Sequence, residues 1–115
     1  MEDRELLELA AKAARIDGEW YEDENFVGIA NDNPYCWLWN PLKNDGDALR
    51  LAVKLGMVVF TPDANDHTAV VQVDEDVTDD KAPIHTNSLR SNGDDYAATR
   101  RAIVRAAAEI GKSLK

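Results

Sequence analysis

The C-terminal segment, residues 94–115, carries the clearest periodic pattern in the chain. Its apolar and small side chains recur at steps of three and four residues, which places them on one face of an α-helix. That stripe consists of Tyr96, Thr99, Ile103, Ala107, Ile110 and Leu114. Asp94 and Asp95 precede the stripe and Lys112 and Lys115 lie at its other end, an arrangement that complements the helix dipole. The pattern predicts a long amphipathic helix, so the chain needs a packed core against which one face is buried.

Two shorter segments also predict helices. Residues 3–16 have a narrow, alanine-rich face and stop before Gly18, a residue type that often follows a helix end. That face consists of Leu6, Leu9, Ala10, Ala13 and Ile16. Residues 45–55 form the other helix, with Gly56 as the expected left-handed cap. Its apolar face consists of Leu49, Ala52 and Val53.

Between the predicted helices, the side-chain pattern changes to one typical of β-strands joined by turns. Residues 20–40 bring aromatic and β-favouring side chains to both sides of a turn-rich tetrad at 31–34. Residues 57–61 and 68–73 are short apolar runs separated by a second turn-rich segment. Each region therefore predicts one antiparallel strand pair.

The tryptophans of the first hairpin indicate how its last strand is covered. Trp37 and Trp39 are two residues apart and share one face of a strand, whereas Leu38 lies on the other face. A strand with apolar bulk on both faces is typical of a sheet that is covered on both sides.

The element order helix, hairpin, helix, hairpin, helix favours an α+β fold. Local hairpins predict a mainly antiparallel sheet of about four strands, and two-sided strands predict three helices divided over both of its faces. The sequence thus predicts a single domain, residues 1–115, with an alpha-beta-alpha layered sandwich. Residues 74–91 are expected to form a long acidic loop within it, with a short edge strand at 84–86 as the alternative.

The charge balance limits the classes of partner. The chain has 22 acidic residues against 13 lysines and arginines, a formal charge of -9. The electric field of this negative charge repels phosphate backbones and anionic lipids, so neither a nucleic acid nor a membrane is expected as a partner. A basic surface on another protein would be attracted instead. The acids expected to make first contact in the loop are Asp74, Glu75, Asp76, Asp79 and Asp80.

The stretch Asn44-Asp45-Gly46-Asp47 has the oxygen-rich composition of a cation site and also that of a helix start. It does not follow the calcium pattern of an EF-hand or the glycine-rich pattern of a phosphate loop. The interpretation adopted is that Asn44 or Asp45 caps the following helix, with Asp47 in its first turn. Asn92 and Asp94 supply the same residue types before the last predicted helix, and the same capping role is expected for them.

Candidate catalytic groups are sparse. Cys36, His67 and His85 form a nucleophile-base or metal set only if the fold brings them together, and their spacing matches no known motif. A free cysteine in a strand is commonly a small buried hydrophobe, and histidines in loops are commonly solvated. One cysteine excludes an internal disulfide and any multi-cysteine zinc site. No catalytic residue, metal site or cofactor is predicted, and the chain is expected not to be an enzyme.

The alternative function is that of a small ligand-binding or enzymatic domain, and two sets of residues bear on it. Arg101 and Arg105, with Arg100 beside them, suit an anionic ligand, but they also suit ion pairs with the many acids of this chain. The aromatic residues suit a pocket or a protein-binding patch as well as packing within the sheet. They are Trp20, Tyr21, Tyr35, Trp37 and Trp39.

Residues 39–56, "WNPLKNDGDALRLAVKLG", and residues 96–114, "YAATRRAIVRAAAEIGKSL", resemble the phage ABA sandwich domain family. The resemblance implies an alpha-beta-alpha sandwich encoded by a phage or prophage, and it supplies no catalytic residues. Neither a signal peptide nor an apolar run of membrane-spanning length is apparent, so the cytoplasm of the host bacterium is the expected location. The expected function is that of a phage accessory protein that binds a host or phage protein through its acidic surface. Self-association through the alanine-rich helices is a further alternative.

Overall fold

The computed structural model describes residues 2–34, 37–63, 66–74, 84–91 and 93–114, and it shows an α+β fold. The described part contains three helices. They are α1 (Asp3–Ala14), α2 (Asp45–Lys54) and α3 (Asp95–Ser113). None of these helices is long and apolar enough to cross a lipid bilayer.

Within the described ranges, six strands form two separate antiparallel sheets. The N-terminal sheet has the order β1-β2-β3, from β1 (Gly18–Glu22), β2 (Val27–Asn31) and β3 (Leu38–Trp39). The C-terminal sheet has the order β4-β5-β6, from β4 (Val58–Phe60), β5 (Thr68–Asp74) and β6 (Ile84–Arg90).

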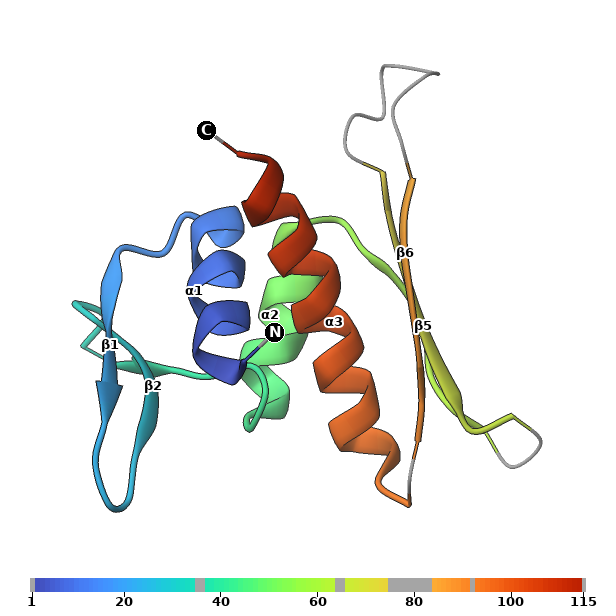
Figure 1. Ribbon diagram of the computed structural model, residues 1–115, viewed down its shortest axis with the longest axis horizontal. Coiled ribbons are helices and arrows are strands. Elements are labelled where there is room, and N and C mark those ends of the chain that lie inside the picture. The colour runs from blue at the N-terminus through green and yellow to red at the C-terminus, as the bar shows by residue number, and fades with distance from the viewer. Residues whose placement is uncertain (1, 35–36, 64–65, 75–83, 92, 115) are drawn as a thin grey trace.

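The helices lie between the two sheets rather than on the outside (Figure 1). α1 packs against the N-terminal sheet, α3 packs against β5 and β6, and α1 and α2 both contact α3. The prediction of one four-stranded sheet between helix layers was wrong in this respect. The inference of two-sided strands failed because Trp37 is exposed outside β3, and because β4 is largely exposed, with only Val59 at its centre partly buried.

The segment expected to be an acidic loop is in part a strand. β6 pairs with β5 over its whole length, from Thr68 opposite Arg90 to Asp74 opposite Ile84. The sequence of β6 is mostly polar, and its identity as a strand comes from this backbone pairing, which composition does not reveal. The short edge strand at 84–86 was therefore the better of the two predictions, although the observed strand is longer.

Small residues allow the helices to approach closely. Buried alanines line α1 and α3, and these faces are therefore occupied within the chain. At Gly111 a Cβ atom would meet the main-chain carbonyl of Leu9, with its carbon only 2.8 Å away. Because α3 is contacted by α1, α2, β5 and β6, it buries a much broader surface than the predicted stripe, while Tyr96 is exposed.

The other two helices also differ in detail from the pattern. α2 buries Asp47, Ala48, Leu51 and Ala52 and exposes two of its three predicted face residues, Leu49 and Val53. α1 ends at Ala14, and its C-cap residue Arg15 takes the left-handed conformation with φ of 58°. Gly18 is instead the first residue of β1. Gly56 has φ of 65°, the conformation predicted for it.

A buried polar arrangement ties β3 to α2. The main-chain N–H of Asn40 donates to Asp47 Oδ2 at 3.0 Å, and Arg50 Nη2 donates to Asp47 Oδ1 at 2.6 Å. The Asn40 side chain donates to the Val27 carbonyl at 2.8 Å and accepts from the Leu42 N–H at 3.0 Å. Both Asn40 and Asp47 are buried, so these hydrogen bonds replace water for groups that would otherwise be unsatisfied.

Candidate functional site

A groove of about 600 Å³ lies between α2, the first turns of α3 and the segment that contains β4. Most of its lining is apolar, and Leu49 and Tyr96 are largely exposed. α2 contributes Asp45, Ala48, Leu49 and Ala52, the β4 segment contributes Val59, Thr61 and Pro62, and α3 contributes Asp95, Tyr96, Thr99, Arg100 and Ile103. The lining includes Leu49 and Ala52 of α2 and Tyr96 and Thr99 of α3, which the sequence pattern placed on the core-facing sides of their helices.

Charges in the groove are arranged around Arg100. Its Nη1 lies 2.6 Å from Asp45 Oδ1, and its Nε donates to the Leu42 carbonyl at 2.9 Å. Only 16% of the Arg100 side chain is exposed, whereas the Asp45 side chain is 65% exposed. The guanidinium is therefore engaged within the fold, and a second carboxylate, Asp95, adds negative charge at the same groove.

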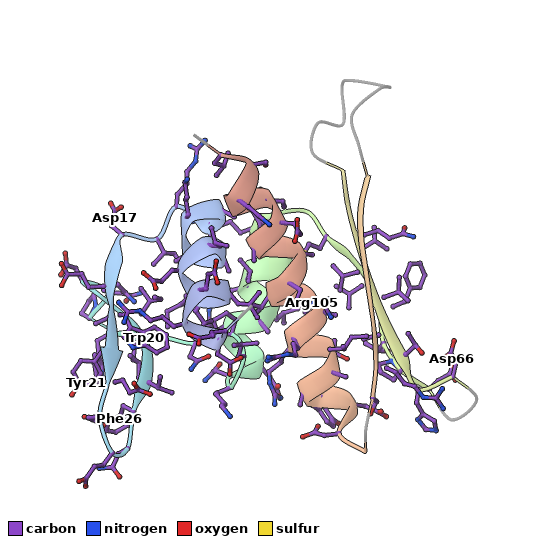
Figure 2. All side chains as sticks on the ribbon, viewed as in Figure 1. Asp17, Trp20, Tyr21, Phe26, Asp66 and Arg105 are labelled. Carbon is purple, nitrogen blue, oxygen red and sulfur yellow. The ribbon has the colours of Figure 1, made fainter. Side chains whose placement is uncertain are left out.

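The structure does not bring the predicted anion-binding arginines into this groove. Arg101 Nη2 donates to Asp3 Oδ1 of α1 at 2.8 Å. Arg105 is exposed on α3, outside the lining (Figure 2). The basic residue that the groove does contain is Arg100, and it already has a carboxylate partner.

The residues expected at helix starts have distinct roles. Asn44 is the N-cap of α2, and its side chain accepts from the Asp47 N–H at 2.9 Å. Asp94 is the N-cap of α3 and accepts from the Ala97 N–H at 3.0 Å. Asp45 pairs with Arg100, while Asp47 holds Asn40. Asn92 lies outside the described residues.

Most of the proposed acidic contact surface also lies outside the described residues. Glu75, Asp76, Asp79 and Asp80 belong to the part that is not described, and Asp74 is the last residue of β5. Of the candidate catalytic groups, Cys36 is likewise outside, and His85 is placed only as part of the backbone of β6. His67 Nδ1 lies 3.9 Å from Asp95 Oδ1. Among the side chains that are described, no three His, Cys, Asp or Glu residues are grouped as a metal site.

A second feature is an aromatic cluster on the N-terminal sheet, formed by Tyr21, Phe26 and Trp37. The ring centroids of Tyr21 and Trp37 are 5.3 Å apart with planes at 82°, and those of Phe26 and Trp37 are 6.0 Å apart with planes at 69°. Trp37 is 47% exposed, and Tyr21 and Phe26 are also exposed. Figure 2 shows Tyr21 and Phe26 on the β1–β2 hairpin, at the side of the molecule away from Asp66.

The remaining predicted aromatics do not join this cluster. Trp39 is 6% exposed and packs in the core, and Trp20 lies toward α1, with the Arg4 guanidinium 5.5 Å from its ring. Trp37 and Trp39 therefore do not share a face as predicted, because β3 begins at Leu38 and Trp37 lies outside the strand. Tyr35 lies outside the described residues, and Phe26 was missed because it stands alone in an acidic turn.

Asp23 fixes the turn beside the aromatic cluster. Its Oδ1 accepts from the main-chain N–H groups of Asn25 and Phe26 at 2.8 and 2.7 Å, and its Oδ2 accepts from the Tyr21 hydroxyl at 2.6 Å. The hydrogen bond from Tyr21, followed by those from the two N–H groups, lowers the pKa of Asp23. The same bond, with the charge of Asp23, raises the pKa of Tyr21.

These two shifts predict opposite pH limits for the turn. The lowered pKa of Asp23 means that its contribution to stability is present above its ordinary value of 3.8 and is lost as the pH falls through the lowered pKa. The raised pKa of Tyr21 means that its contribution to stability is present below pH 10.0 and is lost as the pH rises through the raised pKa.

In the variant Asp23→Asn, the pKa of Tyr21 is expected to fall toward 10.0, which NMR titration of its ring would measure. Glu24→Gln changes the net charge equally and removes no bond to Tyr21, so an equal fall in that variant would contradict the assignment.

The chain matches no protein-family model, no curated protein and no solved structure.

Proposed function

We propose that this chain is a non-enzymatic protein-binding module whose groove takes an extended partner segment with alternating apolar and basic side chains. The observation that carries the proposal is the apolar lining of the groove together with the exposed carboxylates of Asp45 and Asp95. Concave apolar surfaces with a few polar groups favour ligand binding, and charge complementarity favours a basic partner over an acidic one.

The position of β4 supports an extended conformation for the bound segment. β4 lies at the edge of the C-terminal sheet, and Val59 at its centre lines the groove. An edge strand presents backbone N–H and C=O groups that a further strand can pair with. A segment added to β4 would place alternate side chains into the groove against α2 and α3, as in other cases of strand addition.

The contacts of the groove residues favour binding over catalysis. The hydroxyl of Thr99 donates to the Asp95 carbonyl at 2.7 Å, and Arg100 is paired with Asp45. These groups are therefore engaged in holding the groove together. An anionic ligand, the alternative drawn from the arginines, would have to displace the Asp45 carboxylate from Arg100 while facing Asp95.

The biological setting belongs to the same proposal. The resemblance of residues 39–56 and 96–114 to the phage ABA sandwich family supports a phage or prophage origin, and with it a host or phage protein as the partner in the cytoplasm of the host bacterium. The layer order observed here, with helices between two sheets, is not the one that this resemblance implies.

A matched pair of substitutions on α2 tests the groove. Leu49 lines the groove and is 64% exposed, whereas Val53 is one turn further along, 73% exposed and not among the lining residues. Leu49→Lys and Val53→Lys therefore change the net charge identically at two exposed positions of one helix. We expect Leu49→Lys to weaken binding about tenfold or more, through loss of an apolar contact and repulsion of the basic segment, and Val53→Lys to have little effect.

Peptide-display selection with the wild-type chain as bait supplies the ligand for this comparison. Enriched sequences are expected to alternate apolar residues with lysine or arginine, and selection is expected to fail with Leu49→Lys but not with Val53→Lys. Enrichment of acidic sequences would overturn the proposed charge preference. Equal losses in both variants would show that the groove is not the binding site.

A further inference from the structure

The outer face of the N-terminal sheet gathers three aromatic side chains from three different segments. Tyr21 comes from β1, Phe26 from the β1–β2 turn and Trp37 from the residue before β3. All three are exposed, and the Trp37 ring makes edge-to-face contacts with both Tyr21 and Phe26. Large aromatic rings gathered on a surface, rather than scattered singly, are typical of an interaction site.

The neighbouring strand leaves room for this arrangement. Gly28 lies directly opposite Tyr21, and strand alternation places Ala30 on the same face. A Cβ atom at Gly28 would lie 2.6 Å from the Trp39 carbonyl oxygen and 3.3 Å from Leu38 Cδ1, so only glycine fits there. With two small residues on the middle strand, the Trp37 ring can lie across the sheet and reach both Tyr21 and Phe26.

The segment that carries the cluster has charged side chains of one sign, and one of them, Asp23, contacts the cluster directly through Tyr21. Between Arg15 and Lys43 the sequence contains no lysine or arginine. The same interval contains six acids, Asp17, Glu19, Glu22, Asp23, Glu24 and Asp32. Aromatic faces attract cations through their quadrupole, and carboxylates attract them directly, so both kinds of group at this surface select the same ligand charge.

We propose that the aromatic cluster is a second binding site, separate from the groove, that takes an arginine side chain presented by a partner protein. A guanidinium is planar, stacks on aromatic faces and donates several hydrogen bonds, so it can contact Trp37 or Phe26 while bonding to a neighbouring carboxylate. Lysine has a compact, strongly hydrated charge that stacks less well. An uncharged apolar ligand would contact the aromatic rings but would not be attracted by the carboxylates.

NMR of the tryptophan indole N–H groups tests this site. The probe is a short peptide in which glycines alternate with two arginines, and its control is the same peptide with neutral citrulline at both positions. The Trp37 resonance is expected to shift saturably with the arginine peptide and much less with the citrulline peptide. The buried Trp39 resonance should not shift, which makes it an internal reference for the fold.

Two variants separate ring contacts from general attraction to the acidic surface. Trp37→Leu and Phe26→Leu keep the net charge and are each expected to weaken arginine-peptide binding roughly two- to fivefold. An unchanged affinity in both variants would overturn the proposal in favour of simple charge attraction, and equal binding of the citrulline peptide would overturn it in favour of a merely apolar patch. Leu49→Lys and Val53→Lys should bind the arginine peptide equally, so failure of the groove proposal and failure of this one give different results.

Discussion

Replacement of Gly111 by alanine is expected to lower the free energy of unfolding by about 3 kcal/mol, the upper part of the range for overpacking a close contact. The added Cβ atom meets the Leu9 carbonyl, a main-chain group of α1 that cannot rotate away as a flexible side chain does. α1 and α3 must then move apart, and their alanine contacts lose part of their packing. Thermal unfolding followed by circular dichroism should show a midpoint lower by roughly 10 °C or more.

Gly46→Ala is the matched control, because Gly46 also lies in a helix. Its Cβ atom would have as nearest neighbours Arg50 Nη1 and Asn44 Oδ1, both at 3.2 Å and both at the ends of side chains. Alanine also has the higher helix propensity, by about 1 kcal/mol. A stability within about 1 kcal/mol of the wild type is therefore expected. If Gly111→Ala were as stable as Gly46→Ala, the close contact between α1 and α3 would not exist in solution.

The second large effect is expected at Asp47. Asp47→Ala removes the acceptor of the buried Asn40 N–H and the partner of Arg50, and should lower the free energy of unfolding by about 3 kcal/mol. Most of this loss comes from the Asn40 N–H, which is left without that acceptor in a buried position. Urea denaturation with an unchanged slope would measure the loss as a change in stability alone.

Two companion variants divide the Asp47 effect. Asp47→Asn retains an oxygen that can accept from the Asn40 N–H and should lose only about 1 kcal/mol. Arg50→Ala removes a guanidinium that is 66% exposed and is expected to change stability by less than that. A larger loss for Arg50→Ala than for Asp47→Ala would show that the ion pair within α2, rather than the hydrogen bond to Asn40, makes the larger contribution to stability.

The sequence predicted the local elements better than their assembly. The three helices and the antiparallel pairing of neighbouring strands follow from short-range patterns, and the structure contains both. The layer order depends on which strand faces are covered, and a three-residue strand such as β4 has too few side chains to indicate this. β6 was mostly missed because its pairing with β5 is a tertiary property.

The candidate sites were hidden for related reasons. The apolar residues of α2 lie on more than one face of the helix. The sequence does not show that the face with Leu51 is buried while Leu49 and Val53 are exposed. The central position of α3 explains its many buried alanines, which a single amphipathic stripe does not describe. Phe26 joins Tyr21 and Trp37 only through the hairpin, so its role could not be inferred from spacing along the chain.

The aromatic cluster lies on the N-terminal sheet, whereas the groove is lined by α2, α3 and the segment that contains β4, so the two proposed sites share no residue. Both can therefore be occupied at once, and the chain could join two different proteins or clasp one of them at two points. The longest dimension of the molecule is 38 Å, so a connecting stretch of roughly a dozen extended residues would be long enough for a single partner to reach both sites. With a stretch of that length, the second contact would form at a high effective concentration, and two individually weak contacts would add up to a long-lived complex.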